Sequence, residues 1–267
     1  MPRSARAKSE YGYYHVIARG NGRQILFEDD EERLRILKLL KEKLTAHDIR
    51  LHAWCLMDNH VHLLMDDPHD ALSAAMHAIM TAYARYYNDR SGHIGSVFEN
   101  RFKSIPIRDD AQLLVAARYI HLNPERAGIC SYDLYPWSSA AEYLDGTSGI
   151  TDTEVLRELL SGTAGAAAFH HDPTAGPYVP VAGRRVDDTD VLEAARMATH
   201  PLDPHQLKGL AKPVRNQALQ KLRDCHLTIK QIERVTGIGR GTIVRNTVGA
   251  RQKRKRRQGH AADRPHR

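Results

Sequence analysis

The chain has 267 residues, a length that suits one large domain or two small ones. Its hydrophobic fraction of 42% is ordinary for a soluble protein, and its apolar runs are too short to predict a membrane span. The net charge of +7 indicates a polyanionic partner, with nucleic acid as the first candidate.

The N-terminus and the cysteines predict where the protein works. Residues 1–8 are basic but lead into no apolar segment, so we expect no secretory signal. The three cysteines, Cys55, Cys130 and Cys225, lie far apart and show no Cys-x-x-Cys spacing. This pattern predicts neither a disulfide framework nor a zinc ribbon, and it favours a reducing, cytoplasmic location.

Strand-like and helix-like periods alternate in the first half of the chain. Residues 13–18, rich in aromatic and β-branched side chains, predict a strand, and a basic loop with two glycines follows. The next segments predict a helix, two strands, a helix, a strand and a helix, at residues 31–46, 49–57, 60–65, 71–89, 103–108 and 110–122. Asp109 or Asp110 should cap the last helix, and Pro124 is expected to end it.

The order strand, helix, strand, strand, helix, strand is the split βαβ, or ferredoxin-like, arrangement. It predicts an α+β fold in which a four-stranded antiparallel sheet carries helices on one face. Asp58 and Asn59 form a natural two-residue hairpin turn between the second and third strands. The third strand should therefore lie near the centre of the sheet.

Two histidines one residue apart, His60 and His62, mark that third strand. Residues i and i+2 of a strand project to the same face, so the two imidazoles can offer nitrogen ligands to one divalent metal ion. The chain has 16 histidines, so close pairs also arise by chance, and packing is the alternative role. Further residues are needed to separate these two readings.

The helix predicted after the fourth strand offers such residues. Tyr119 and Asn123 are four residues apart and share a flank beside an apolar stripe formed by Leu113, Ala117 and Ile120. If that flank faces the histidine strand, the site gains a nucleophile in Tyr119 and a neutral oxygen ligand in Asn123. A metal ion held by two imidazoles and an amide oxygen could polarise a phosphate for attack by the tyrosine.

Composition changes after about residue 144. Residues 162–168 are rich in alanine and glycine and residues 172–180 are turn material, so we expect a flexible boundary between residues 163 and 189. Beyond it three helices are predicted, the second capped by Thr228 and ended by Gly237, at residues 213–225, 229–235 and 242–246. Two short helices joined by a glycine turn fit a helix-turn-helix, although a generic helical hairpin gives the same pattern.

Basic side chains favour DNA as the ligand of this C-terminal region. Its last short helix starts at Arg240 or Gly241 and carries Arg245, and a tail rich in arginine and lysine would add phosphate affinity as a disordered arm. The domains expected from the sequence are a catalytic domain, a helical or linker segment, a helical DNA-binding domain and a basic tail, at residues 1–145, 146–190, 191–250 and 251–267.

Several segments of the first half resemble the REP-associated tyrosine transposases of the HUH single-tyrosine transposase superfamily. The resemblance is carried by residues 14–21, 56–64 and 118–128, and also by Phe98 and the segments 101–104 and 137–139. It covers about residues 11–145. Residues 212–248 look like the replication-initiator helix-turn-helix that some relatives carry.

The resemblance implies a metal-dependent enzyme that nicks and joins single-stranded DNA at hairpin-type repeats. Its metal ion would be Mg²⁺ or Mn²⁺, its products a 5′-phosphotyrosine and a free 3′-OH. In this chain Tyr119 would be the nucleophile, and the metal ligands would be His60, His62 and Asn123. DNA-binding roles are implied for the residues Arg19, Gly20, Asn21, Arg101, Lys103, Arg234, Arg240 and Arg245.

The partners expected are single-stranded or hairpin DNA and, through the helix-turn-helix, duplex DNA, bound by a monomer or a homodimer. Two other functions compete with the enzyme. One is a DNA-binding regulator that uses the helix-turn-helix and carries an idle transposase-like domain. The other is an RNA-binding ferredoxin-like module, which would place exposed aromatic residues where His60 and His62 stand.

Overall fold

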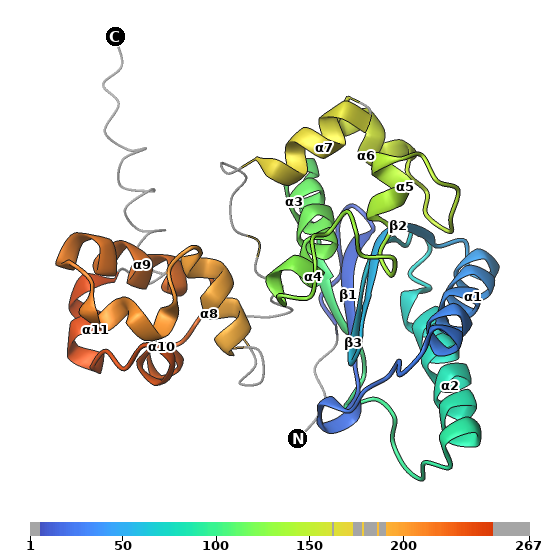
Figure 1. The fold of residues 1–267 in the computed structure, drawn as a ribbon, viewed down its shortest axis with the longest axis horizontal. Coiled ribbons are helices and arrows are strands. Elements are labelled where there is room, and N and C mark those ends of the chain that lie inside the picture. Colours follow the sequence, from blue (N-terminus) through green and yellow to red (C-terminus); the bar gives the residue numbers. More distant parts are fainter. Residues whose placement is uncertain (1–5, 162, 173–177, 179–185, 187–190, 248–267) are drawn as a thin grey trace. The chain divides into compact units, whose positions relative to one another are not determined.

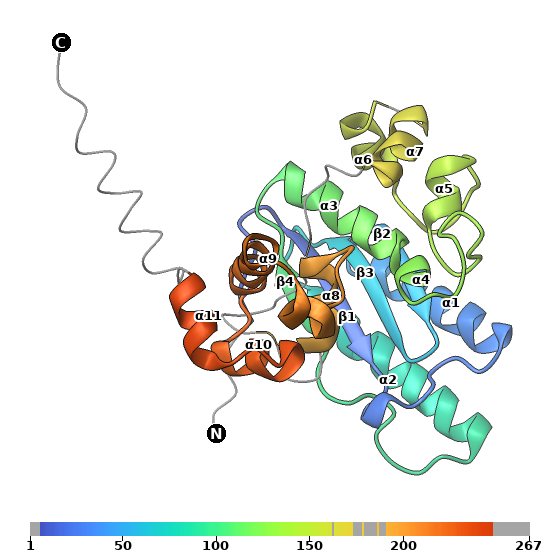
Figure 2. The ribbon, with the colours of Figure 1, turned by 60° about the vertical axis from the view of Figure 1, so that its left-hand side comes forward.

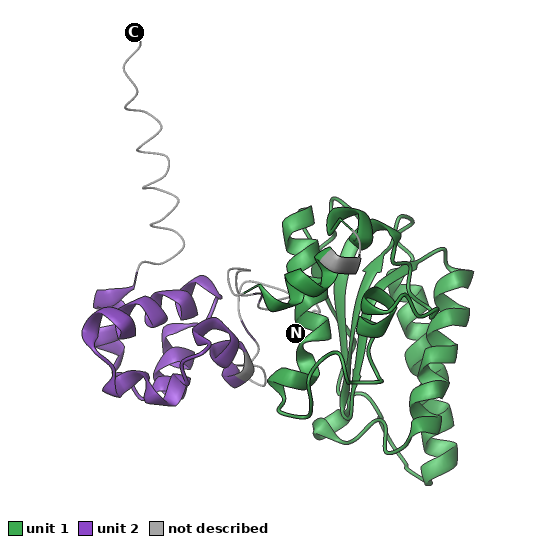
Figure 3. Cartoon of the chain, turned by 45° about the horizontal axis from the view of Figure 1, so that its top comes forward, with its two compact units in different colours: residues 1–176 green, residues 177–267 purple. Residues whose placement is uncertain are grey.

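The computed structural model describes residues 6–161, 163–172, 178, 186 and 191–247, which belong to two units, residues 1–176 and 177–267 (Figure 3). The basic tail predicted at residues 251–267 lies outside the described residues, as does most of the linker predicted up to residue 189.

The first unit is built on a four-stranded antiparallel sheet with the spatial order β2-β3-β1-β4. Its strands are β1 (Tyr13–Arg19), β2 (Arg50–Met57), β3 (His60–Asp66) and β4 (Lys103–Pro106). This is the ferredoxin-like sheet predicted from the order of the elements, and β3 is one of its two inner strands.

Two helices, α1 (Asp30–Ala46) and α2 (Leu72–Ser91), cover one face of this sheet (Figure 1). Val16 of β1 and Leu63 of β3 are fully buried in the core that these helices share with the sheet. Val16 pairs with Leu63 across the two strands, so both side chains point toward the helices. The α+β fold class, with both crossover helices on one face, is confirmed.

A third helix, α3 (Asp110–His121), lies on the opposite face, followed by the short helix α4 (Asn123–Arg126) (Figures 1 and 2). Asp109 caps α3, because its Oδ1 accepts a hydrogen bond of 2.7 Å from the backbone N–H of Gln112. The helix ends at His121, within one residue of the predicted end at about residue 122. Pro124 also has a role that was not predicted, since it occupies the first turn of α4, where its missing N–H costs nothing.

Residues beyond α4 protect the outer edge of β2. The backbone N–H of Ser139 donates to Trp54 O at 2.9 Å, and that of Asp152 donates to Leu51 O at 2.8 Å. An uncovered strand edge would offer these groups to another chain, so the contacts keep the sheet closed on this side. The remaining helices of the unit are η1 (Asn21–Arg23), α5 (Ala140–Leu144), α6 (Glu154–Leu159) and α7 (Thr163–His171).

Helix α7 occupies a stretch whose composition had indicated a linker. Its alanines are good helix formers, and Ala166 is fully buried against the rest of the unit. Gly165 has a specific reason to be glycine, since a Cβ there would lie 1.5 Å from the carbonyl oxygen of Leu160. Close packing against the end of α6 therefore explains the composition that suggested a loop.

The second unit is helical, and its core is one cluster of buried apolar side chains that includes Leu219, Ile232 and Ile243. Thr228 and Gln231 form the predicted capping box at the start of α10, and Gly237 ends that helix with a φ of +63°. The helices are α8 (Val191–Thr199), η2 (Pro204–Gly209), α9 (Lys212–Asp224), α10 (Ile229–Thr236) and α11 (Arg240–Asn246). Across the described residues of both units, no helix is long and apolar enough to cross a membrane.

Candidate active site

Strand pairing gathers polar side chains on the face of the sheet that α3 covers. Arg19 of β1 stands opposite His60 of β3, and Ile17 stands opposite His62. Side chains alternate along a strand, so Arg19 and His15 project to the same face as the two histidines. The sheet therefore presents three imidazoles and a guanidinium together.

Hydrogen bonds orient both histidines of β3 in the same sense. The ring centroids of His60 and His62 lie 4.9 Å apart, with an angle of 81° between the rings. Nδ1 of His60 lies 2.7 Å from Oδ1 of Asn59, and Nδ1 of His62 lies 2.9 Å from Nε2 of His15. Both bonds engage Nδ1, so Nε2 is the atom that each ring can present to a metal ion.

The electrostatics keep His62 neutral. Burial, together with the charges that His60, His15, Arg19 and Arg126 can carry, holds the pKa of His62 well below its ordinary value. Burial also lowers the pKa of His15, to about 3. Nε2 of His62 is buried, and no described residue gives it a hydrogen-bond partner. A neutral imidazole nitrogen with an unused lone pair is the form that binds metal ions, and burying it otherwise costs free energy.

Tyr119 of α3 lies directly against these histidines. Its ring centroid is 5.5 Å from that of His62 and 5.7 Å from that of His15. The apolar stripe of α3, including Leu113 and Ile120, is buried as the sequence pattern predicted, and it carries the tyrosine onto the sheet. The structure thus brings Tyr119 together with the His60–His62 pair in one chain.

Arg126 covers the tyrosine from outside. Its guanidinium carbon lies 4.9 Å from the centre of the Tyr119 ring, although Arg126 itself is exposed. Tyr119 exposes only 1% of its surface, so a phosphate can reach its hydroxyl only after a covering group moves. Arg126 is an exposed side chain able to make that movement.

Asn123 is placed differently from the prediction. It begins α4 and does not share α3 with Tyr119, because a break at Leu122 separates the two helices. Its buried side-chain Nδ2 donates to Tyr119 O at 2.8 Å and to Ile120 O at 3.4 Å. With Nδ2 engaged in this way, Oδ1 is the atom of Asn123 that could bind a metal ion. Its role as third ligand stays a prediction.

Comparison with known proteins identifies this part of the chain. Residues 8–123 match the family model described as "Transposase IS200 like". These residues form an IS200-like transposase domain. A solved REP-associated tyrosine transposase bound to a REP hairpin is 16% identical, with a TM-score of 0.48, over 56% of this chain and 90% of that one. No curated protein matches the sequence.

The description of the family model names it for transposases, so the similarity of residues 8–123 is to a family of DNA-transposing enzymes. Members typically use a divalent metal ion. The residues here fit one, since His62 offers a buried, neutral Nε2 beside His60. Among the described residues, no group of three or more His, Cys, Asp or Glu side chains is placed to hold a metal ion.

The basic loop after β1 lies next to the histidine strand. The backbone N–H of Gly20 donates to Asn59 O, and that of Asn21 donates to Val97 O, both at 2.9 Å. These bonds hold the loop beside the turn that precedes His60. Lys103 of β4 stands opposite Ile17 and so projects to the histidine face, whereas Arg101 is an exposed residue just before that strand.

The other predicted DNA-binding residues, Arg234, Arg240 and Arg245, belong to the second unit. All three are exposed on that unit. Their DNA-binding role therefore stays a separate prediction.

Sequence reasoning gave no role to His15, Asn59 or Arg126. A histidine inside an otherwise apolar strand was a signal for His15, but its partner could be known only from the register of β1 against β3. Asn59 had been read only as a turn residue. Arg126 lies seven residues after Tyr119, and only the short helix α4 turns it back over the ring.

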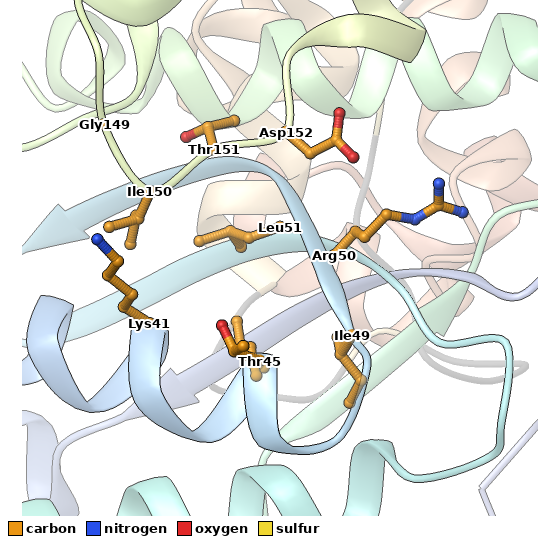
Figure 4. A pocket seen from close by; sticks show the side chains of 10 residues that line it. Lys41, Thr45, Ile49, Arg50, Leu51, Gly149, Ile150, Thr151 and Asp152 are labelled. Atoms are coloured by element: carbon orange, nitrogen blue, oxygen red, sulfur yellow. The ribbon is translucent and has the colours of Figure 1, made fainter.

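A cavity of about 310 Å³ lies elsewhere in this unit, between α1, β2 and the segment 149–152 (Figure 4). Lys41 and Arg50 surround an apolar floor that includes Leu51 and Ile150. Arg50 begins β2, whereas Met57, the residue opposite His60, ends it. Seven residues of strand, about 23 Å, separate these ends, so the cavity is not part of the histidine site.

Proposed function

We propose that the protein is a metal-dependent enzyme that nicks single-stranded DNA at hairpin-type repeats and transfers the strand through a 5′-phosphotyrosine intermediate. The observation that carries the proposal is the contact of the Tyr119 ring with His62, whose buried Nε2 has no hydrogen-bond partner among the described residues. This contact supports the proposal because it would put the nucleophile beside a metal ligand in the part of the chain that matches the transposase family model.

His60 and His62, with Oδ1 of Asn123, are the residues proposed to hold Mg²⁺ or Mn²⁺. A bound divalent ion would supply positive charge that polarises the scissile phosphate. The Nδ1–H groups of His60 and His62 can donate to Oδ1 of Asn59 and Nε2 of His15, so the rings stay in the orientation that a metal ligand needs.

Tyr119 is proposed to attack phosphorus through its hydroxyl oxygen. The new P–O bond to tyrosine forms as the bond to the 3′ oxygen breaks. The phenol loses one proton to solvent and the departing 3′ oxygen gains one, so protons balance. Arg126 would leave the tyrosine ring and pair with the phosphate. Attack by a 3′-OH on the phosphotyrosine reverses these steps and rejoins a strand.

A label can test the polarity of this reaction. The 3′-side fragment of the cut strand should remain on the protein, so a 3′-end label should migrate with the protein on a denaturing gel when Mn²⁺ is present. A 5′-end label should appear as a free fragment ending in a 3′-OH. Tyr119→Phe should abolish the labelled protein band, whereas Tyr11→Phe, at a tyrosine that is 60% exposed, should leave it unchanged. Equal adduct in Tyr119→Phe and the parent would refute the assignment.

We also propose that the helical unit binds duplex DNA. Its α10 and α11 are joined by the Gly237 turn, and α11 buries Ile243 while Arg240, Val244 and Arg245 are exposed. Arg245→Ala in the full chain should reduce the salt dependence of duplex binding by about one unit of slope, with Lys208→Ala as a control outside the two helices. Duplex binding without adduct on any hairpin would favour the regulator over the enzyme.

A further inference from the structure

Hydrogen bonds connect α7 to α3, the helix that carries Tyr119, although α7 lies outside residues 8–123 of the transposase domain. Arg118 of α3 donates hydrogen bonds from Nε and Nη2 to His170 O, at 3.2 and 3.1 Å, and from Nη2 to Asp172 O at 2.7 Å. His170 O belongs to the last turn of α7, whose carbonyls have no partner within the helix. One guanidinium thus caps α7 and ties it to α3.

A second connection runs through His121, the last residue of α3. Nδ1 of His170 lies 2.7 Å from Ala166 O and therefore carries the hydrogen. Nε2 of His170 must then accept a bond from Nδ1–H of His121, at 2.8 Å. Nε2 of His121 accepts in turn from the Ser139 hydroxyl, at 2.9 Å. One consistent set of tautomers satisfies every side chain in this hydrogen-bonded series.

The side chains of this hydrogen-bonded series are deeply buried. His121, His170 and Ser139 expose 1%, 5% and 0% of their surfaces. The Tyr132 ring stacks on His170, with centroids 4.8 Å apart and planes 6° from parallel. Buried networks in which every member has a partner hold their elements in one arrangement, because any displacement leaves polar groups unsatisfied.

Arg118 and His121 flank Tyr119, and they share a side of α3 because they are three residues apart. Tyr119 itself contacts the histidines of the sheet. The sheet therefore contacts α3 through Tyr119, while α7 binds α3 through Arg118 and His121. A shift or rotation of α3 would have to break the Arg118 and His121 bonds before it could move the tyrosine away from His62.

We infer that Arg118, His121 and His170 are positioning residues, and that α7 braces α3 so that the Tyr119 hydroxyl is held at the histidine pair. The inference rests on the proposed role of Tyr119 as nucleophile. It assigns a function in the reaction to a helix that the transposase domain does not include. Misplacement of a reacting group by 1 Å can cost about a hundredfold in rate, so loss of the brace should slow chemistry more than binding.

Hydrogen exchange of the full chain tests the brace without relying on catalysis. His170→Ala should speed amide exchange in residues 110–121 about tenfold, while peptides from α2 stay unchanged. His77→Ala, at an exposed histidine of α2, is the matched control and should alter neither region. Arg118→Lys keeps the charge but loses the paired bonds, so it serves as the milder variant if His170→Ala folds poorly.

Adduct formation on a saturating labelled hairpin with Mn²⁺ gives the second readout. His170→Ala should lower the first-order rate at least about tenfold. Its affinity for the hairpin, measured in a Tyr119→Phe background, should stay within about twofold, because phosphate contacts dominate DNA binding. His170→Gln, whose amide can replace Nε2, should restore much of the rate.

The two readouts separate the brace from the proposed function. Unchanged exchange in residues 110–121 of both His170→Ala and Arg118→Lys would overturn the brace, whatever the enzyme does. A slower rate that came only from weaker DNA binding, with no rescue by His170→Gln, would also overturn it. Faster exchange of α3 with no adduct from the parent would leave the brace supported and refute the nucleophile instead.

Discussion

Replacement of Arg126 by alanine should slow adduct formation if the guanidinium group of this arginine moves from the Tyr119 ring to the scissile phosphate and pairs with it. The guanidinium carbon lies 4.9 Å from the ring centre, and its charge contributes to the electrostatic environment of His62. It is therefore close to both the nucleophile and a proposed metal ligand. The substitution removes the charge and also uncovers a tyrosine that is 1% exposed.

The size of the effect follows from the exposure of Arg126. A hydrogen bond to a charged group such as the phosphate contributes about 1.5–3 kcal/mol, whereas leaving an aromatic ring at an exposed site costs about 0.5–1 kcal/mol. Bound DNA should exclude much of the water, and the interaction with the phosphate should strengthen as negative charge develops there. A loss of about 1–2 kcal/mol of transition-state stabilisation corresponds to a rate about 5- to 30-fold lower.

The assay is the first-order rate of covalent adduct formation with hairpin DNA and Mn²⁺ both saturating. Arg126→Lys should retain part of the rate, because it keeps the charge without the planar guanidinium. Arg108→Ala removes one exposed positive charge near the far end of β4 and controls for the general attraction of DNA. Its rate at saturation should equal that of the parent.

A faster rate in Arg126→Ala would mean that the arginine only covers the tyrosine, and the reasoning above would be refuted. A rate equal to that of Arg108→Ala would refute it as well, since no specific contribution would remain. A lower rate that disappears at higher DNA concentration would place Arg126 in DNA binding and not in catalysis.

Three further predictions concern metal binding, folding and pH. His15→Ala should weaken Mn²⁺ binding about 10- to 100-fold by calorimetry of a Tyr119→Phe protein, because His62 loses the bond that orients its ring; unaltered affinity would contradict this. Thr228→Ala should destabilise the helical unit by about 1 kcal/mol in denaturant melts, because the capping box is lost. Burial lowers the pKa of His170, and the positive charges of Arg118 and His171 lower it further, whereas the hydrogen bond to the Ala166 carbonyl raises it. His121 and Tyr132 also lie against the His170 ring. Because the folded protein binds a proton at His170 less readily than the unfolded chain, the stability that neutral His170 contributes is complete above a pH of about 6.5 and is lost as the pH falls below that value. His170→Gln should therefore reduce the decline of the melting temperature between pH 7.5 and 5.5.

The sequence predicted the sheet and its helices well, because each element carries its own periodic signal. Alternation of side chains along β3 was enough to place His60 and His62 on one face. The position of Arg19 opposite His60 depends on the register of β1 against β3, which no local sequence pattern determines. The same holds for Arg118, whose partners are carbonyl groups about fifty residues further along the chain.

Two short helices, α4 and α7, were not placed from the sequence, for local physical reasons. Pro124 was read only as the stop of the helix before it, but proline is equally suited to the first turn of a new helix. Residues 163–171 were assigned to a helical or linker segment with a flexible boundary, because alanine and glycine also make flexible chains. Burial of Ala166 and the approach of Leu160 O to Gly165 supply the packing that makes a helix there instead.

The histidine site and the core of the sheet depend on one register. A slip of β3 by one residue against its neighbours would turn His60 and His62 toward the apolar layer beneath α1 and α2 and turn Val61 and Leu63 toward α3. The Asp58–Asn59 turn opposes such a slip, because Asp58 O accepts from the backbone N–H of Leu26 and Phe27, and Asp58 pairs with Arg33 at 2.9 Å. Asn59 then orients His60 directly. The residues that fix the hairpin therefore also aim a proposed metal ligand, which links the stability of the fold to the geometry of the site.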